Sequence, residues 1–412
     1  MIDDMKLNKA ARSAFAVLLC AACIAYAAVC LYTGGFAMYA NLSDARPFAS
    51  LRDARAFAAT LEDALYQNMY GRTLLFEAHA AAQRFAGKYE TNGFEILRDK
   101  AGFLEYGRFA PYGLAQARAN AQKLWRLQSL TEARGGKFLF VAPPARCRRY
   151  EAGAYPVGLP YPNPHPFYDA LFYQLHLYGV AAADLRVNVE EEGLPFDAYT
   201  FRTDDRLPAE AAFSAFRAAV DALNRDFDAG LDPDGFYRDI RAYQKETYAQ
   251  SFLGYIGRRA GMAFGGLDDF TVMWPAFPSF YTLTTYSNRG VSQTWAGPGP
   301  TTLLQPEVLR EAAEARDPHR FDLYRVYLGG AYYYARIRNP AAVPDAPRLL
   351  LIHDGTAAPL AVFLAPLFRE ITIVAPVKAK LSADAESYLR DRMESMPEYV
   401  IVESRAENLE GL

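Results

Sequence analysis

The chain of 412 residues has few cysteines, few histidines and little net charge, and each shortage excludes a class of protein. Of its four cysteines, only Cys147 lies outside an apolar N-terminal stretch, so no intrachain disulfide framework supports the rest of the sequence. The five histidines are scattered and form no cluster with cysteine, which argues against a metal site. A net charge of −3 gives no electrostatic footprint for nucleic acid. We therefore expect no metal, no other cofactor and no nucleic-acid partner.

The longest hydrophobic run lies near the N-terminus and indicates export. Residues 13–32 contain no charged side chain, and a helix that crosses the hydrocarbon layer needs about 20 residues. Three basic residues precede this run and none follows before Arg46, so the positive-inside rule places the remainder outside the cytoplasm. We expect residues 1–35 to be a membrane anchor, which makes this a single-pass protein with an extracytoplasmic C-terminal domain. The alternative is a signal peptide cleaved near Ala27, which gives a secreted protein.

The remaining sequence alternates between strand-like and helix-like segments. A connector and helical stalk over residues 36–84 precedes an ectodomain over 85–412, in which residues 92–97 and 101–106 form a hairpin. Uninterrupted apolar runs such as residues 137–142 are typical of strands buried on both faces. Further strands are expected at 179–185, 198–202, 348–352, 370–374 and 399–403, and helices at 113–132, 208–223, 358–368 and 383–396. This alternation indicates a parallel sheet covered on both faces.

Residues 226–346 interrupt the alternation and are rich in proline, glycine and aromatic residues. We interpret them as a large insertion that is partly β. With 28 tyrosines and 27 phenylalanines, the chain has enough aromatic side chains for a large core or for a surface that stacks on sugar rings.

Short sequence blocks carry a family resemblance. Residues 349–356 (LLLIHDGT), 359–366 (PLAVFLAP) and 251–259 (SFLGYIGRR) are similar to segments of the DHHW family of bacterial cell-surface proteins, and the likeness covers most of residues 85–405. That family resembles a branch of the SGNH-hydrolase-like group, which includes the alginate O-acetyltransferases. The resemblance implies a three-layer SGNH-hydrolase-like, or flavodoxin-like, α/β fold. It also implies a role in cell-surface polysaccharide O-acetylation, with the polysaccharide and a membrane-bound O-acyltransferase as partners.

The residues at the motif positions imply a degenerate site. In the family, an Asp-His-His-Trp motif supplies an aspartate and a histidine, and a later Asp-Ser supplies the nucleophile. Here Asp204 matches the aspartate, Arg206 replaces the histidine and Gly355 replaces the serine. Arginine stays protonated at physiological pH and cannot accept the proton of a serine, and glycine has no nucleophile. The resemblance therefore implies a pseudoenzyme that binds glycan or a partner.

Two neighbouring residues keep an active enzyme open as an alternative. Thr356 carries a hydroxyl one residue beyond Gly355, and His353 lies two residues before it. With these residues the chain is an O-acetyltransferase or esterase with a relocated nucleophile. Successive strand residues point to opposite faces, however, so the two side chains need not converge. A second alternative is a structural or interaction protein unrelated to acetylation.

Candidates for substrate binding flank the motif positions or lie in the aromatic region. They are Asp205, Asp354, Tyr332, Trp274 and Trp295. Tyr332 follows Ala331 where the family often has Gly-Gly-Asn-His, so an amide that helps to stabilise an oxyanion is missing. A connected, exposed aromatic strip beside Asp204 is expected if the region binds glycan, whereas full burial indicates a structural role.

Overall fold

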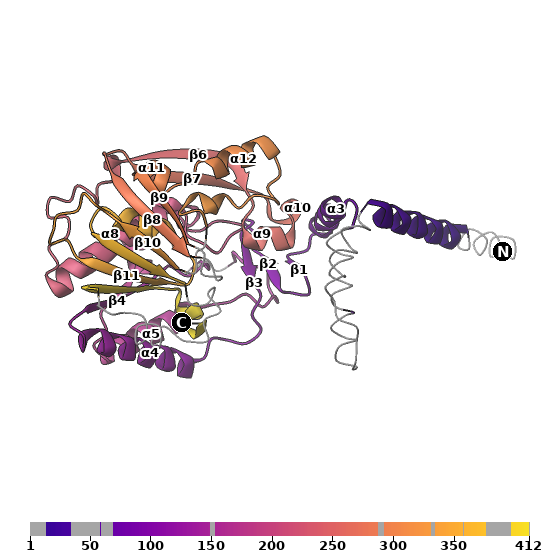
Figure 1. Ribbon diagram of the computed structural model, residues 1–412. Coiled ribbons are helices and arrows are strands. Elements are labelled where there is room, and N and C mark those ends of the chain that lie inside the picture. The colour runs from indigo at the N-terminus through magenta and orange to yellow at the C-terminus, as the bar shows by residue number, and fades with distance from the viewer. Residues whose placement is uncertain are drawn as a thin grey trace, which may run out of the picture. The chain divides into compact units, whose positions relative to one another are not determined.

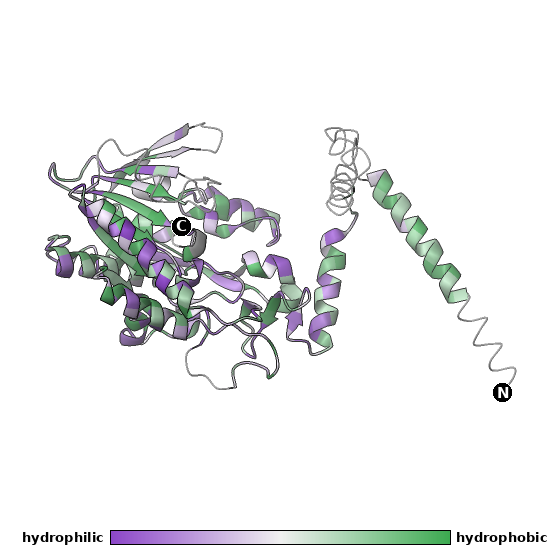
Figure 2. Ribbon diagram, turned by 90° about the horizontal axis from the view of Figure 1, so that it is seen from below, coloured by the Kyte–Doolittle hydropathy of each residue, from purple (hydrophilic) through white to green (hydrophobic). Residues whose placement is uncertain are grey.

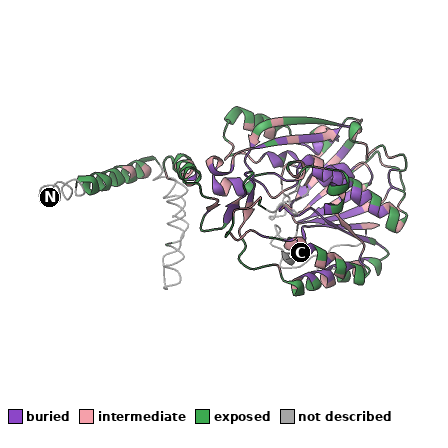
Figure 3. Ribbon diagram, turned by 180° about the vertical axis from the view of Figure 1, so that it is seen from behind, coloured by how far each residue is buried: buried purple, intermediate pink, exposed green. Residues whose placement is uncertain are grey.

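A computed structural model describes residues 14–33, 58, 69–148, 153–286, 292–330, 334–356, 358–375 and 397–411. The chain divides into two compact units, Met1–Ala82 and Gln83–Leu412. In the first unit, Ala14–Thr33 forms a 20-residue helix with a mean hydropathy of 2.5. This helix is apolar and exposed along most of its length (Figures 2 and 3). Its length and composition suit a membrane-crossing helix, and both a signal anchor and a signal sequence have these properties.

An eight-stranded sheet in the order β5-β4-β13-β11-β12-β10-β8-β9 forms the centre of the second unit (Figure 1). Its first five strands are mutually parallel. They are β5 (Ala182–Asp184), β4 (Lys137–Ala142), β13 (Tyr399–Glu403), β11 (Arg348–His353) and β12 (Glu370–Val374). The last three pair antiparallel. They are β10 (Tyr334–Arg338), β8 (Phe280–Tyr286) and β9 (Ser292–Pro298).

Helices cover both faces of this sheet, because its central strands are apolar on both sides. Helices α4 (Leu114–Glu132) and α5 (His165–Leu177) pack with Phe138 and Phe140 on one face. Helices α8 (Ala209–Phe227) and α13 (Ala358–Leu364) pack with Leu139 and Val141 on the other. The two helical layers lie on opposite sides of β4 and β11 in Figure 1. The expected α/β class with three layers is confirmed.

The remaining elements are small sheets and short helices outside the large sheet. The expected hairpin is confirmed in a small sheet of β1 (Glu90–Thr91), β2 (Ile96–Arg98) and β3 (Leu104–Tyr106), and a two-stranded ribbon is formed by β6 (Tyr243–Phe252) and β7 (Asp268–Pro275). The other helices are α3 (Arg72–Phe85), α6 (Leu185–Glu191), α7 (Phe196–Tyr199), α9 (Tyr255–Ala260), α10 (Met262–Gly265), α11 (Gly299–Thr302) and α12 (Glu307–Ala315). Short 3₁₀ helices are η1 (Ile240–Ala242), η2 (Leu323–Val326) and η3 (Ala406–Gly411). The expected helix at 383–396 lies outside the described residues.

Two expectations about the sheet need correction. The predicted strand at 198–202 is wrong, because these residues leave α7 and continue as an irregular segment. The Asp268 carboxylate accepts hydrogen bonds from the backbone N–H groups of Arg202 and Thr203. In a strand of a sheet, such N–H groups would donate to a neighbouring strand instead. The sheet is also not wholly parallel, because β8, β9 and β10 from residues 226–346 extend it antiparallel. In β8 and β10 buried and partly exposed residues alternate, which suits strands with one buried face.

Candidate functional site

The two segments that carry the altered motif lie side by side. The Leu207 amide donates a hydrogen bond of 3.1 Å to the Thr356 carbonyl. The Tyr324 hydroxyl lies 2.7 Å from the same carbonyl and 3.1 Å from that of Leu207. Gly355 and Thr356 directly follow β11, so the segments meet at the carboxyl edge of the parallel strands. This is the edge at which open α/β sheets place their ligands.

Thr203 and Asp204 are held by the start of α9. The Thr203 hydroxyl donates to Asp268 over 2.6 Å and accepts from the Gly254 amide over 2.8 Å. The Tyr255 amide, in the first turn of α9, donates to Asp204 Oδ2 over 2.8 Å. The carboxylate therefore satisfies a backbone donor that the helix itself leaves open. Both Thr203 and Asp204 are completely buried.

Asp204, Arg206 and Asp322 form one ion cluster. The guanidinium of Arg206 donates to both oxygens of Asp204, with Nε–Oδ1 at 2.7 Å and Nη2–Oδ2 at 2.6 Å. It also donates to both oxygens of Asp322, with Nη1–Oδ2 at 2.9 Å and Nη2–Oδ1 at 2.8 Å. Its Cζ lies 4.3 Å from the centre of the Tyr324 ring. Each of the three guanidinium nitrogens of Arg206 therefore donates to a carboxylate.

The charges of this cluster stabilise one another. Burial opposes the charged form of Asp204, but the Arg206 guanidinium and its hydrogen bonds outweigh that effect and lower the pKa of Asp204 to about 2. Burial likewise opposes the charge on Arg206, yet the two aspartates raise the pKa of that guanidinium well above its ordinary value. Asp204 and Arg206 therefore both keep their charges at physiological pH, and the arginine cannot accept a proton.

The same local geometry occurs at two other Asp-x-Arg sequences. Asp184 with Arg186, and Asp239 with Arg241, form the same three contacts from the backbone N, Nε and Nη2 of the arginine to the carboxylate. The Arg241 side chain is 88 % exposed, whereas that of Arg206 is 14 % exposed. The Asp-x-Arg ring is thus a local feature of this sequence. The rings at Asp204 and Asp184 are both largely buried, and each arginine has a second carboxylate partner, Asp322 for Arg206 and Asp169 for Arg186. The ring at Asp204 differs in that its own carboxylate is completely buried.

Thr356 lies between two carboxyl groups at the ends of β11 and β13. Its Oγ1 is 2.7 Å from Asp354 Oδ1 and 2.9 Å from Glu403 Oε1. Asp354 Oδ2 accepts from the Arg405 amide over 3.2 Å and from Asn408 Nδ2 over 2.9 Å, which ties the two strand ends together. Burial and the nearby charge of Asp354 raise the pKa of Glu403 well above its ordinary value. Thr356 itself is 4 % exposed.

His353 and Gly355 complete this turn. The Gly355 amide donates to His353 Nδ1 over 3.1 Å, so a neutral ring carries its proton on Nε2. Gly355 has a φ of +100°, a conformation that residues with a side chain rarely adopt. The turn therefore suits glycine at the position where the resemblance expects serine.

Further charged residues lie at the same edge; sequence reasoning missed Arg146 and Arg405 but named Asp205 as a candidate. Arg146, four residues beyond the end of β4, contacts Glu105 Oε2 at 3.4 Å and donates to the Leu104 carbonyl. Arg405 follows the end of β13 by two residues and is buried. Asp205 is partly buried, and burial together with the charge of Asp204 raises its pKa. The available signal was an arginine within four residues of the end of each of the core strands β4 and β13.

The aromatic candidates do not gather at this edge. Trp274 lies at the far end of β7, six residues from Asp268, which is about 20 Å along a strand. Trp274 and Trp295 are both partly buried and pack against the core. Tyr332 and Ala331 lie outside the described residues. Among the described residues, no group of three histidine, cysteine, aspartate or glutamate side chains is arranged to hold a metal ion.

Comparison with solved structures shows that the fold is shared with other proteins. PatB1 of Bacillus cereus, solved with a sulfonyl adduct, matches with a TM-score of 0.56 at 15 % identity, over 76 % of this chain and 97 % of PatB1. A DHHW family protein from Eubacterium siraeum matches with a TM-score of 0.51 at 16 % identity, over 77 % of this chain and 95 % of that protein. No family model matches the sequence, and no curated protein matches it.

These comparisons define the class of protein. The second unit has the α/β fold of PatB1 and of the DHHW family protein, and the likeness spans nearly the whole of both. The expected resemblance to DHHW proteins is thereby confirmed at the level of fold.

Proposed function

We propose that this chain is an extracytoplasmic, membrane-anchored protein of cell-surface polysaccharide O-acetylation that binds glycan or a partner and does not catalyse acetyl transfer. Three findings support the proposal. They are the fold shared with a DHHW family protein, the apolar N-terminal helix, and the sequence blocks that resemble that family. The partners implied are a polysaccharide and a membrane-bound O-acyltransferase.

The observation that carries the proposal is the cluster of Asp204, Arg206 and Asp322. A serine nucleophile needs an imidazole that exchanges its proton, and an aspartate that orients the imidazole. Here the aspartate is paired with a guanidinium whose three nitrogens each donate to a carboxylate. Gly355 supplies no hydroxyl, and its positive φ disfavours a side chain.

The test is an assay of acetyl-ester hydrolysis and of acetyl transfer to glycan with the full-length chain in detergent. We expect no turnover above the uncatalysed rate. A double variant, Arg206→His with Gly355→Ser, is expected to gain partial hydrolysis because it restores the base and the nucleophile. Turnover by the unmodified chain that disappears in Asp204→Asn overturns the proposal.

One observation favours a second candidate function, an active esterase or acetyltransferase. The Thr356 hydroxyl lies within hydrogen-bond distance of both Asp354 and Glu403, and a carboxylate can act as a general base. If Thr356 is the nucleophile, Thr356→Val abolishes turnover and Thr356→Ser retains it. The same assay therefore separates the two candidates.

A further inference from the structure

A cavity of about 740 Å³ lies at the opposite edge of the large sheet from the Asp204 cluster. Its lining includes Pro347 just before β11, Leu367 just before β12 and Ser279 just before β8. The six-residue strand β11 separates this edge from Thr356 by about 20 Å. The cavity is thus independent of the altered motif, and its volume is that of a ligand pocket, about 300–1,000 Å³.

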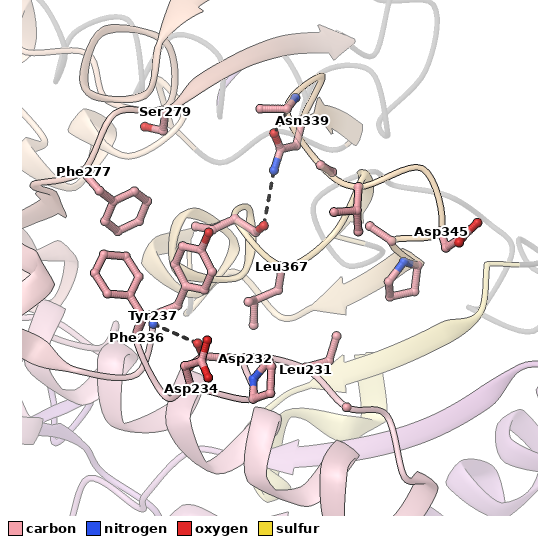
Figure 4. Close-up of a pocket in the computed structure, with 18 of the residues that line it drawn as sticks. Leu231, Asp232, Asp234, Phe236, Tyr237, Phe277, Ser279, Asn339, Asp345 and Leu367 are labelled. Carbon is pink, nitrogen blue, oxygen red and sulfur yellow. Dashed lines mark hydrogen bonds between the residues drawn. The ribbon is translucent and has the colours of Figure 1, made fainter.

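Aromatic rings form one wall of the cavity. Phe236, Tyr237 and Phe277 lie together at one end, with Leu367 in the middle (Figure 4). The centre of the Phe277 ring is 5.4 Å from that of Phe236 and 5.2 Å from that of Tyr237. Phe277 also contacts the buried ring of Tyr243 at 5.8 Å, so the wall is supported by the core.

Phe236 is the most exposed of the three rings of this wall. The side chain is 50 % exposed, although a phenylalanine is ordinarily buried. Neighbouring rings already hold the Phe236 ring in place, so the side chain loses little conformational entropy when a ligand stacks on it. Flat apolar faces of this kind suit the C–H faces of sugar rings.

Acidic side chains are the charged groups of the cavity. Its lining contains Asp232, Asp234 and Asp345 and no lysine, arginine or histidine. Asp232 is engaged by the Tyr237 amide at 3.0 Å and by Arg238 Nε at 3.1 Å, and so shapes the loop. Asp234 and Asp345 are exposed and able to accept hydrogen bonds from a ligand. This charge repels uronates and other anionic sugars, and favours hydroxyl and ammonium donors.

We propose that the cavity binds neutral or amino-sugar rings of a polysaccharide, which stack on Phe236 and Phe277 and donate hydrogen bonds to Asp234 and Asp345. The choice of a glycan as ligand rests on the proposed function. The site itself goes beyond that function, because it lies at the edge of the sheet that the altered motif does not touch. A chain of sugars held there is positioned without contact to Arg206.

The test is titration calorimetry of the full-length chain in detergent with three probes. They are an oligomer of N-acetylglucosamine, an oligomer of glucosamine and an oligomer of galacturonate. We expect the first two to bind, and the galacturonate oligomer to bind at least tenfold more weakly. Phe236→Ala is expected to weaken binding of both favoured probes about tenfold. Asp234→Asn with Asp345→Asn is expected to weaken the glucosamine oligomer more than its neutral counterpart.

Matched controls use exposed residues outside the cavity lining. Phe109→Ala removes a 77 % exposed ring, and Glu311→Gln with Glu314→Gln removes two exposed carboxylates of α12. Both are expected to leave affinity unchanged. Absence of saccharide binding, binding that survives Phe236→Ala, or preference for oligolysine over saccharide overturns the inference. Acetyl-ester turnover by the chain overturns the proposed function instead, and leaves the Phe236→Ala result to decide on the cavity.

Discussion

At the scale of single residues, burial makes the Asp204–Arg206 contact important for stability. Arg206→Ala leaves the completely buried Asp204 carboxylate with two backbone donors, and leaves Asp322 without its guanidinium. Breaking a buried ion pair by removing one partner costs about 3–5 kcal/mol. We expect a loss of that size in the free energy of unfolding, measured by urea denaturation of the full-length chain in detergent.

Arg241→Ala is the matched control for this prediction. It removes the arginine of the same local ring, formed with Asp239, at an exposed position. Exposed ion pairs contribute little to stability, so we expect no measurable change. Equal losses in the two variants mean that the ring itself, and not its burial, carries the stabilisation.

The residues of the cluster differ in how far the sequence predicts them. Arg206 cannot act as a base, and an ion pair with Asp204 two residues away is a local feature that the sequence indicates. Asp322 is 116 residues from Arg206 in the chain, and its place beside Arg206 depends on how η2 packs. Such a contact follows from tertiary structure and has no local signal.

At the scale of elements, α9 fixes the position of the Asp204 loop through two glycines. A Cβ on Gly254 would lie 2.3 Å from Asp204 Cβ and 2.5 Å from the Thr203 carbonyl oxygen. A Cβ on Gly257 would lie 2.7 Å from Thr203 Cβ. These approaches explain why the segment around residues 251–259, which carries part of the family resemblance, contains glycines at these positions.

We predict that Gly254→Ala displaces the loop and lowers stability by about 1–3 kcal/mol, the usual range for overpacking. The measurement is the midpoint of thermal unfolding together with near-UV circular dichroism, which reports on the packing of the aromatic side chains. Gly113→Ala is the control, because a Cβ there meets no atom within 4 Å. As an N-cap change it is expected to cost about 1 kcal/mol or less. A Gly254→Ala variant as stable as Gly113→Ala contradicts the packing argument.

Strands that are buried along nearly their whole length can be predicted from the sequence. The runs at β4 and β11 are apolar at every central position, and both strands occur where their pattern predicts them. The segment at 198–202 is also expected to be a strand, but the backbone N–H of its last residue, Arg202, donates to the side chain of Asp268, 66 residues away in the chain. The antiparallel pairing of β10 with β12 likewise depends on a partner that a local pattern does not identify.

At the scale of the whole molecule, buried carboxyl groups set the pH dependence of stability. Burial raises the pKa of six of them, namely Asp99, Glu105, Asp205, Asp268, Glu403 and Glu407. Between the ordinary carboxyl pKa of about 4 and the raised value, the folded state binds more protons than the unfolded state. Stability from these groups is therefore present at acidic pH and is lost as the pH rises.

The contribution of Asp204 to stability changes with pH in the opposite direction. Its pKa of about 2 lies below the ordinary value, so its contribution is present above about pH 4 and is lost as the pH falls toward 2. The two effects together predict maximal stability near about pH 4–5. A melting temperature that rises steadily from pH 5 to pH 8, measured by scanning calorimetry of the full-length chain, contradicts this prediction.

Glu403→Gln measures how much one carboxyl group contributes to the dependence of stability on pH. Glutamine keeps an oxygen that accepts from the Thr356 hydroxyl, and it stays neutral at every pH. Because Glu403 is completely buried beside Asp354, the wild-type chain must either hold a proton there or bury a second charge as the pH rises. Because the glutamine of the variant neither binds a proton nor carries a charge, the free energy of unfolding of the variant should depend less on pH, by up to about 1.4 kcal/mol per pH unit.

Glu314→Gln on exposed α12 is the control, and it should leave the pH dependence of the free energy of unfolding unchanged. An unchanged pH dependence in Glu403→Gln means that Glu403 is ionised in the folded state, and Thr356 then lies beside a carboxylate that can accept its proton, as an active threonine nucleophile requires.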